Sequence, residues 1–290
     1  MSEGTYKIGT GDQQKGMPAL DNAVEVGLNG PLFVMAGPCV IETEQNCFDI
    51  AEKLVGIRDR TGIGIIFKAS FDKANRSSIG SFRGPGIEAG LQILKNVREK
   101  FGMPVMTDLH ETAQAKIVAQ AVDCIQVPAF LCRQTDLLMA CARTRLPINV
   151  KKGQFMSPAE MTNVVEKIRA CGNAKIMLTE RGTFFGYNRL VNDMTSLEAM
   201  KQIGYPAIFD VTHSTQQPGG IGNASGGSRE LAPILAKAAV ASGANGLFIE
   251  THTDPANAKS DAACVMPIEW LEPLLVTCKK IFDIIREPQN

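Results

Sequence analysis

The sequence lacks a net charge, because its 290 residues hold thirty Lys and Arg against thirty Asp and Glu. A nucleic-acid partner would require a basic face that releases counterions from phosphates, so we expect no nucleic-acid binding. Long apolar runs are also missing. Residues 32–36 and 246–249 are among the longest, far short of the roughly 20 residues that span a bilayer. We therefore expect no transmembrane helix and no membrane partner.

A secretory signal is missing as well. The first thirty residues include Asp12, Lys15, Asp21 and Glu25 and have no apolar core of the kind that a signal peptide needs. None of the eight cysteines falls in a CxxC pair. In a large chain without such a signal, cysteines are usually reduced. We expect a cytoplasmic protein whose cysteines include four small core residues, Cys47, Cys141, Cys171 and Cys278.

Short apolar runs recur eight times, each followed by a polar residue and then by a longer segment of helical period. This pattern indicates repeated βα units. The runs cover residues 32–36, 64–67, 104–107, 124–127, 147–150, 175–178, 206–211 and 246–249. No linker or composition shift divides the chain. The sequence therefore predicts an α/β fold, a (β/α)8 TIM barrel, as one domain over residues 1–290.

Local signals add detail to this barrel. Residues 157–160, Ser-Pro-Ala-Glu, predict a capped helix with a buried face of Met161, Val164, Val165 and Ile168. A second helical face is predicted after Ser228, at Leu231, Ile234, Leu235, Ala238 and Ala239. Residues 6–8 and 24–26, in an N-terminal extension over residues 1–30, predict a β-hairpin that closes the barrel bottom. The GxG at residues 62–64 precedes a strand and does not open a helix, so we reject a dinucleotide site.

Polar residues follow every predicted strand. In a barrel the carboxyl ends of the strands carry the active site, and eight strands that all end in this way are hard to obtain from helix capping alone. The residues are Cys39, Lys68 with Lys73, Asp108, Gln126, Lys151, Glu180 with Arg181, His213 and Glu250. We expect His110 and His252, the other two histidines, to make structural hydrogen bonds.

Seven of the candidate loop residues are basic: Lys68, Lys73, Arg76, Arg83, Arg133, Lys151 and Arg181. Their convergence at one barrel mouth would neutralise a substrate with several negative charges, and Arg offers a bidentate fork for phosphate. The Gly-rich residues 218–228 run into a helix, and free amides at a helix start bind phosphate. Together with residues 75–78 they predict two phosphate sites. The zero net charge of the chain would then be the sum of an electropositive barrel mouth and of acidic residues that lie mostly elsewhere.

A thiol, an imidazole and two carboxylates follow the first, seventh and eighth strands, which become neighbours when the barrel closes. They are Cys39, His213, Glu250 and Asp261. A metal site is therefore feasible, although the spacing matches no zinc-finger pattern. The mixed S, N and O donors would suit zinc, iron(II) or manganese without choosing among them.

Several long motifs now stand in order at successive strand ends. They occupy residues 68–78, 126–134, 151–155, 179–183 and 185–188. From about residue 31 to 275 the chain resembles the 3-deoxy-D-manno-octulosonate 8-phosphate synthase family. The resemblance implies a (β/α)8 barrel, usually a homotetramer, that condenses phosphoenolpyruvate with D-arabinose 5-phosphate and releases inorganic phosphate. The product is a precursor of a lipopolysaccharide sugar.

The resemblance also implies roles for individual residues. Phosphoenolpyruvate would be bound by Lys73, Lys151 and Arg181 with the backbone around Ala129 and Arg133, and Lys68 and Gln126 would lie close by. Arabinose 5-phosphate would be bound by Asn75, Arg76 and Ser77, joined at its phosphate by Ser225. Asp108 would lie between the two and orient water or a hydroxyl. Within this set, we expect Lys73, Asn75, Asp108 and Lys151 to be catalytic.

The family has a branch that requires a divalent metal and a branch that does not. His213, Glu250 and Asp261 match both branches, whereas the metal-dependent branch has Cys where the other has Asn. Here the residue is Cys39. The resemblance therefore implies metal dependence.

Two alternatives remain. The related 3-deoxy-D-arabino-heptulosonate 7-phosphate synthase uses erythrose 4-phosphate and typically has Lys-Pro-Arg-Ser/Thr where this chain has residues 73–77, Lys-Ala-Asn-Arg-Ser. Asn75 and Ser78 favour the five-carbon sugar. A barrel that only senses anions or metal is the alternative of another class, and the retention of every cation, Asp108 and all four metal candidates argues against it.

Overall fold

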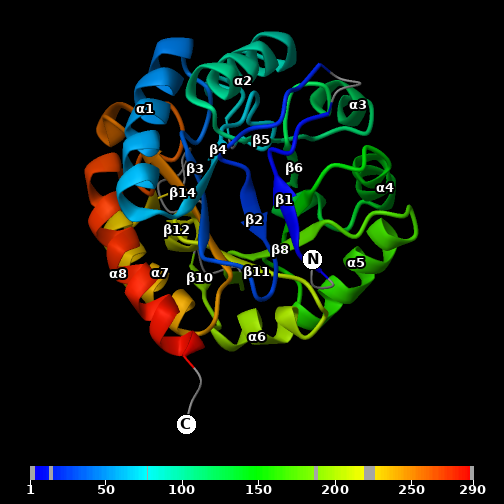
Figure 1. Ribbon diagram of the computed structural model, residues 1–290, viewed down its shortest axis with the longest axis vertical. Coiled ribbons are helices and arrows are strands. Elements are labelled where there is room, and N and C mark those ends of the chain that lie inside the picture. The colour runs from blue at the N-terminus through cyan, green and yellow to red at the C-terminus, as the bar shows by residue number, and fades with distance from the viewer. Residues whose placement is uncertain (1–3, 13–15, 77, 186–188, 219–225, 288–290) are drawn as a thin grey trace.

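Eight parallel strands form a closed barrel in the computed structural model, which describes residues 4–12, 16–76, 78–185, 189–218 and 226–287. Neighbours in sequence pair around the ring, and β11 pairs with β14 to close it (Figure 1). The predicted TIM barrel is confirmed. Its strands are β3 (Phe33–Gly37), β4 (Gly64–Lys68), β5 (Val105–Asp108), β6 (Cys124–Val127), β7 (Ile148–Lys151), β8 (Ile176–Glu180), β11 (Ala207–Asp210) and β14 (Gly246–His252).

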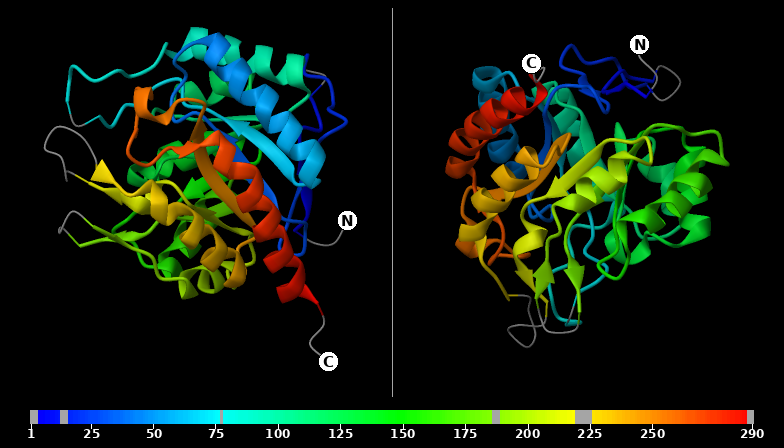
Figure 2. Two further views of the ribbon diagram at one scale, coloured as in Figure 1. Left: turned by 90° about the vertical axis from the view of Figure 1, so that its left-hand side faces the viewer. Right: turned by 90° about the horizontal axis from the view of Figure 1, so that it is seen from below.

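A ring of helices surrounds the barrel (Figures 1 and 2). They are α1 (Glu44–Thr61), α2 (Ile87–Phe101), α3 (Gln114–Val118), α4 (Thr135–Arg143), α5 (Met161–Arg169), α6 (Thr195–Lys201), α7 (Ala232–Ala241) and α8 (Ile268–Arg286). Short strands pair at the carboxyl end of the barrel. β9 (Thr183–Phe184) pairs with β10 (Leu190–Val191), β12 (Gln216–Gln217) pairs with β13 (Gly226–Gly227), and β15 (Met266–Pro267) pairs in parallel with the end of β14. No helix among the described residues is both long and apolar enough to cross a membrane.

Alternation along the strands separates two hydrophobic cores. In β4, Ile65 and Phe67 pack in the large core against the helices, whereas Ile66 packs in a second core inside the barrel. Successive side chains of a strand point to opposite faces. Lys68 therefore follows Ile66 into the barrel, and Asp210 follows Ile208 in the same way. The interior is apolar in its lower part and polar at its carboxyl end.

The predicted N-terminal hairpin is confirmed. β1 (Tyr6–Ile8) pairs antiparallel with β2 (Val24–Val26). Its apolar side chains join the inner core with Phe33 at the start of β3. Gly64 makes room for it, because a Cβ there would lie 3.0 Å from Val24 Cγ1. The hairpin thus covers the amino end of the barrel (Figure 1), and only the carboxyl end is left for a site.

One predicted helix face is confirmed and another is wrong in part. Ser157 and Glu160 form a capping box, and Met161, Val164, Val165 and Ile168 are buried. In α7 the buried residues are Ala232, Ala236, Ala239 and Val240, whereas Leu231 and Ile234 are 49% and 58% exposed. A 3₁₀ turn, Arg229–Leu231, precedes the helix and shifts its phase, and the small alanines form the face that packs.

The cysteines mostly follow the prediction for core residues. All eight lie in the described part of the chain and none is in a disulfide. Cys47, Cys141 and Cys278 are buried, and Cys171 is half-buried.

A buried ion pair joins three segments near the amino end of the barrel. Arg98 of α2 and Asp123, just before β6, are 2% and 6% exposed. Both oxygens of Asp123 accept from Arg98 Nε, at 3.1 and 3.0 Å, and one of them also accepts from the backbone N–H of Val105. Arg98 Nη2 donates to the carbonyl of Pro18 in the N-terminal extension. The Arg98–Asp123 pair thus connects α2, the start of β5 and the N-terminal extension.

We predict that Asp123→Ala lowers the free energy of unfolding by about 3–5 kcal/mol, because it leaves the Arg98 guanidinium buried without a counter-charge. Urea denaturation followed by circular dichroism measures the change. Glu272→Ala is the matched control: it breaks the Arg60–Glu272 pair, also bidentate but on the surface, and should leave stability close to wild type. A loss below about 1 kcal/mol for Asp123→Ala, the range of an exposed pair, would contradict the prediction.

Candidate active site

A cavity of about 890 Å³ opens at the carboxyl ends of the barrel strands. Strands β4, β5, β6, β7 and β14 and the loops that follow β4, β5, β6, β7, β8, β11 and β14 supply its walls. It brings together most of the sequence candidates, from positions spread over nearly 200 residues. They are Lys68, Lys73, Asn75, Arg76, Asp108, Gln126, Ala129, Lys151, Arg181, His213, Glu250 and Asp261.

Four of the cavity cations are buried. Lys68, Lys73, Lys151 and Arg181 are between 2% and 9% exposed. Lys68 Nζ donates to Ser70 Oγ at 2.7 Å and lies 3.4 Å from Asp108 Oδ1. It also lies 3.7 Å from Glu250 Oε1, as Lys73 Nζ does at 3.6 Å. The four cations therefore lie among carboxylates that reduce the cost of burying them.

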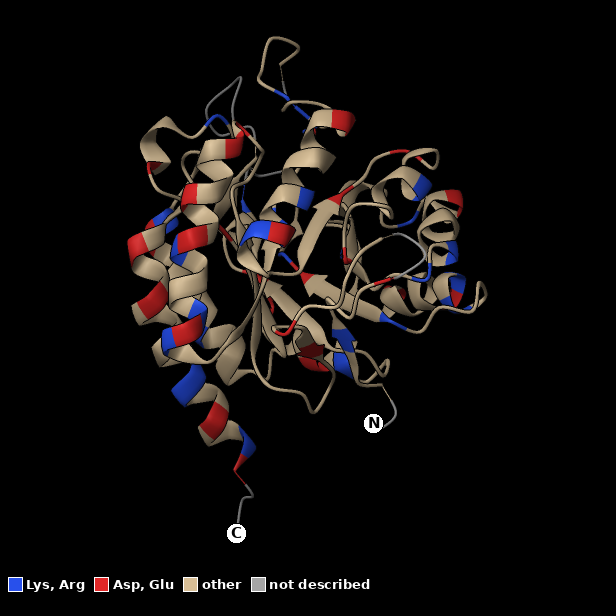
Figure 3. Ribbon diagram, turned by 45° about the horizontal axis from the view of Figure 1, so that its top comes forward, with Lys and Arg blue, Asp and Glu red and all other residues tan. Residues whose placement is uncertain are grey.

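This arrangement adds detail to the expected charge distribution. Acidic residues were predicted to lie mostly away from the mouth, and of the thirty in the sequence only a few, among them Asp108, Asp210, Glu250 and Asp261, lie in it or directly beside it. The outer helices also carry both signs of charge, as Figure 3 shows. The mouth is thus a mixed cluster and not a purely basic surface.

The charges shift one another's pKa values. Burial alone would raise the pKa of the Asp108 carboxyl, but Lys68, His110 and Lys73 hold it well below its ordinary value. Burial also lowers the pKa of Lys151 to about 8, although Asp210 opposes the change. For Glu250, burial is outweighed by His213, Lys73 and Lys68, which lower its pKa to about 2. Both carboxylates are therefore ionised at neutral pH.

The loop after β4 reaches across the mouth to the loop after β14. Arg76 is half-buried, and its guanidinium donates to the carbonyls of Phe82 and Lys259, both at 2.9 Å. Asn75 is exposed beside it on the cavity wall. Ser77 and Ser225, the other two residues expected on this side, lie outside the described residues. Asn75 and Arg76, the two described candidates for the arabinose 5-phosphate site, therefore form part of one cavity wall.

Three of the candidate residues, two from the basic loop set and one strand-end carboxylate, lie elsewhere. Arg83 pairs with Asp72 on the surface, and Arg133 is exposed and does not line the cavity. Glu180 is buried, but it accepts hydrogen bonds from the backbone N–H groups of Arg181 and Gly182. Since Arg181 does line the cavity, the alternation of the chain turns Glu180 away from it. Glu180 thus supports the loop that carries Arg181.

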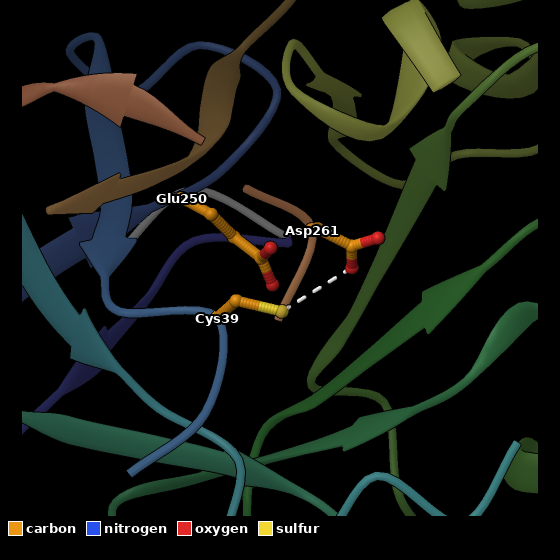
Figure 4. A group of neighbouring side chains, drawn as sticks. All are labelled: Cys39, Glu250 and Asp261. Atoms are coloured by element: carbon orange, nitrogen blue, oxygen red, sulfur yellow. Dashed lines mark hydrogen bonds between the residues drawn. The ribbon is translucent and has the colours of Figure 1, made fainter. Parts of the chain in front are cut away.

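The metal candidates converge beside the cavity. Cys39 Sγ and carboxylate oxygens of Glu250 and Asp261 lie within 4.8 Å of one another, and the three side chains point toward a common centre (Figure 4). Cys39 Sγ lies 3.3 Å from Asp261 Oδ2. His213 Nε2 lies 3.4 Å from Glu250 Oε2 and 3.8 Å from Asp261 Oδ2. The fold therefore brings the Cys39 sulfur and two carboxylates together as a possible metal site, and it places the His213 ring beside the two carboxylates.

Two further observations suit a cation at this cluster. Glu250 Oε1 is buried without a hydrogen-bond partner among the described residues, since Lys68 and Lys73 Nζ lie 3.7 and 3.6 Å away, beyond hydrogen-bond distance, and a bound cation would supply a direct contact. Asp261 adopts the left-handed conformation, with φ of 49°, and such strain is found where a side chain must be aimed. The residues present therefore form a possible metal site, and their mixed donors fit a divalent transition metal.

Some site residues escaped the sequence analysis. Asp210 is fully buried and pairs with Lys151 and His213. Ser70 bridges Lys68 and Asp108. Asp210 could have been found from alternation, because it shares the inward face of β11 with Ile208. Ser70 lies beyond the end of β4, where alternation no longer predicts direction.

The two other histidines differ from each other. His252 accepts a hydrogen bond from the backbone N–H of Asp254 at 2.9 Å and contacts Asn46 at 3.1 Å, so its structural role is confirmed. His110 lines the cavity, with Nε2 3.5 Å from Asp108 Oδ2. Its Nδ1 is buried and has no hydrogen-bond partner among the described residues. His110 therefore lines the cavity beside Asp108, and its expected structural role stays a prediction.

Comparison with known proteins places these features in a family. Residues 11–287 match the DAHP synthetase I family. A protein from Thioalkalivibrio sulfidiphilus is 53% identical over 90% of this chain and 94% of its own length, and one from Protochlamydia amoebophila is 50% identical over 90% and 95%. A third, from Albidiferax ferrireducens, is 54% identical over 87% and 91%. All three are named 2-dehydro-3-deoxyphosphooctonate aldolase. This chain belongs to the DAHP synthetase I family and, within it, to the 2-dehydro-3-deoxyphosphooctonate aldolases, which are also called 3-deoxy-D-manno-octulosonate 8-phosphate synthases.

Proposed function

We propose that the protein condenses phosphoenolpyruvate with D-arabinose 5-phosphate and water, giving 3-deoxy-D-manno-octulosonate 8-phosphate and inorganic phosphate. This is an aldol-type transferase reaction that supplies a lipopolysaccharide precursor. One observation carries the proposal. In a member of this family, a single cavity holds four buried cations beside a thiol, an imidazole and two carboxylates.

Phosphoenolpyruvate would bind at the buried cations. Lys73, Lys151 and Arg181 come from three different strand ends and line the same cavity. Arg181 Nη2 already donates to Gln216 Oε1 at 2.6 Å, which orients its fork. A phosphate or carboxylate matches that planar fork, and the two ammonium groups add charge without fixed geometry. Gln126 Oε1 has no partner among the described residues and lies in the same cavity. Arg133 remains a prediction for this site, as does the backbone near Ala129.

Arabinose 5-phosphate would bind at the cavity wall that the loop after β4 forms. Asn75 and Arg76 lie there, and Arg76 is held in place by two carbonyl oxygens of the rim. Ser77 and Ser225 remain proposed partners for its phosphate. Two anionic substrates would then meet near Asp108, which lines the same cavity and has an ionised carboxylate.

In the reaction, the enol carbon of phosphoenolpyruvate attacks the sugar aldehyde, and water adds to the neighbouring carbon. The resulting hemiketal phosphate expels phosphate, so a carbon–oxygen bond breaks. Asp108 orients the attacking water or a hydroxyl. The cavity cations stabilise the negative charge on the carboxylate, phosphate and aldehyde oxygens.

Cys39, His213, Glu250 and Asp261 would hold a divalent metal ion: zinc, iron(II) or manganese. When bound, such an ion polarises a carbonyl oxygen or lowers the pKa of a water molecule. The neighbouring Lys68 and Lys73 limit the negative charge of the ligand cluster, because both lie within 3.7 Å of Glu250 Oε1.

The family resemblance further supports a homotetramer in the cytoplasm, and we propose that residues 1–290 form one domain. The heptulosonate synthase reaction with erythrose 4-phosphate is the enzymatic alternative. Asn75, which that branch lacks at this position, lies on the cavity wall and argues for the longer sugar.

We predict that phosphate release from phosphoenolpyruvate is at least about 10-fold faster with arabinose 5-phosphate than with erythrose 4-phosphate, measured as kcat/KM. Asn75→Ala should reduce this preference while changing the KM for phosphoenolpyruvate little. Arg83→Met, which alters a loop cation outside the cavity, should leave both values unchanged. Faster turnover of erythrose 4-phosphate would favour the heptulosonate alternative, and no release with either sugar would favour a sensing barrel.

A second prediction concerns the metal. Exhaustive chelation should lower kcat by about 10–100-fold or more, and a divalent metal should restore it. Cys39→Asn should lose bound metal, measured by elemental analysis, but keep part of the activity, because Asn stands here in the metal-independent branch. Cys278→Ala, a buried cysteine in α8, is the control and should keep its metal. Full activity in metal-free wild-type protein would overturn the metal assignment.

A further inference from the structure

Asp210 is a fully buried carboxylate to which the proposed reaction assigns no role. It is the last residue of β11 and points into the barrel mouth. Its Oδ2 lies 2.5 Å from Lys151 Nζ and 2.9 Å from His213 Nδ1. One oxygen atom therefore contacts both a cation of the anion-binding cavity and a ligand of the possible metal site.

The contact with Asp210 determines how His213 presents its ring. Lys151 Nζ also lies 3.3 Å from His213 Nδ1, but it makes its short contact, at 2.5 Å, with Asp210 Oδ2. An ionised carboxylate only accepts hydrogen bonds, so in the contact with Asp210 it is Nδ1 of His213 that carries the hydrogen. Asp210 Oδ1 also accepts the backbone N–H of His213 at 3.0 Å, which holds residue and ring together. The other ring nitrogen, Nε2, is thereby directed toward Glu250 and Asp261. This is the arrangement in which a carboxylate orients a metal-binding histidine.

Asp210 holds Lys151 as well. It is the only carboxylate within ion-pair distance of Lys151 in the described part of the chain. The ammonium also lies 3.4 Å from the centroid of the Phe248 ring. The Lys151 charge is thus shared between one carboxylate and whatever anion enters the cavity.

We propose that Asp210 is a positioning residue that couples anion binding at Lys151 to metal binding at His213. The proposal rests on the proposed function for the identity of both ligands. A metal on Nε2 withdraws electron density from the ring, so Nδ1–H donates more strongly to Asp210 and takes more of its charge. Lys151 is then freer to pair with phosphoenolpyruvate. By linkage, phosphoenolpyruvate must tighten metal binding by the same factor.

The test is a zinc titration of the metal-free protein against a chromophoric chelator, with and without phosphoenolpyruvate. In wild type we expect phosphoenolpyruvate to tighten Zn²⁺ binding by about 5–150-fold, the usual span of coupling between sites. In Asp210→Asn we expect Zn²⁺ affinity to fall by about 10–100-fold. The factor by which phosphoenolpyruvate tightens Zn²⁺ binding should also decrease, toward the value that direct electrostatic attraction between phosphoenolpyruvate and Zn²⁺ alone would give.

Asp123→Asn is the matched control, because it makes the same substitution at a buried, ion-paired carboxylate before β6, away from the cavity. It should lower stability and leave Zn²⁺ affinity and coupling unchanged. Unchanged affinity and coupling in Asp210→Asn would overturn the inference alone. Failure of wild type to bind Zn²⁺ would overturn the metal assignment and the inference with it.

A measurement on wild type needs a variant only to assign the spectrum. The chain has three histidines, so ¹⁵N-histidine labelling gives a simple spectrum that His213→Asn assigns. We expect Nδ1 of His213 to carry a proton and Nε2 to bind zinc in the loaded protein. Zinc on Nδ1, or a rapidly exchanging Nδ1 proton, would overturn the inference.

Discussion

Mutual neutralisation of buried charges at the carboxyl end of the barrel is the interaction on which the rest of the site depends. An isolated charge in this position would cost several kcal/mol of desolvation. Here Lys68 lies between Asp108 and Glu250, and Lys151 pairs with Asp210. Each of these cations is held by carboxylates of other strands: Lys68 of β4 by the adjacent β5 and by β14, and Lys151 of β7 by β11. The charges therefore form one unit, and removal of a single member exposes the others to the full cost of burial.

The barrel geometry makes this unit possible. Inward positions along each strand are apolar near the amino end, where the hairpin of β1 and β2 closes the interior. One or two positions later the same strands present charged groups. At Gly37 the backbone of β3 comes so close to the Lys68 carbonyl that a Cβ would lie 2.2 Å from its oxygen. An apolar floor and a close-packed wall thus keep the polar groups in one layer, where substrates can displace the internal pairs.

Side chains of both charge signs line the barrel mouth, so the same site can bind anionic and cationic ligands. The cations Lys73, Lys151 and Arg181 stand ready for phosphate and carboxylate groups. The thiol of Cys39 with Glu250 and Asp261 offers the opposite character a few ångströms away. Because Glu250 is within 3.7 Å of two lysines, neither group of ligands is electrostatically independent of the other.

Much of this could be predicted from sequence, because hydrophobic period and strand ends are local properties. All eight barrel strands and the hairpin were predicted, and most of the twelve predicted cavity residues followed from their place after a strand, whereas Ala129 was implied only by the family resemblance. The direction in which a side chain points, into or out of the barrel, was harder to predict. Glu180 was placed in the mouth although it alternates outward, and Asp210 was missed although it alternates inward with Ile208. The α7 face was partly wrong because a 3₁₀ turn shifts its phase. The contact of His110 with Asp108 depends on loop geometry, which hydrophobic periodicity does not encode.

The most direct test of the account follows the oxygen of water through the reaction. Phosphoenolpyruvate and arabinose 5-phosphate are turned over in ¹⁸O-labelled water, and both products are analysed by mass spectrometry. If the cations stabilise carbon–oxygen cleavage, the label enters the second carbon of the octulosonate and the released phosphate carries none. Label in the phosphate would mean attack at phosphorus and would contradict the account.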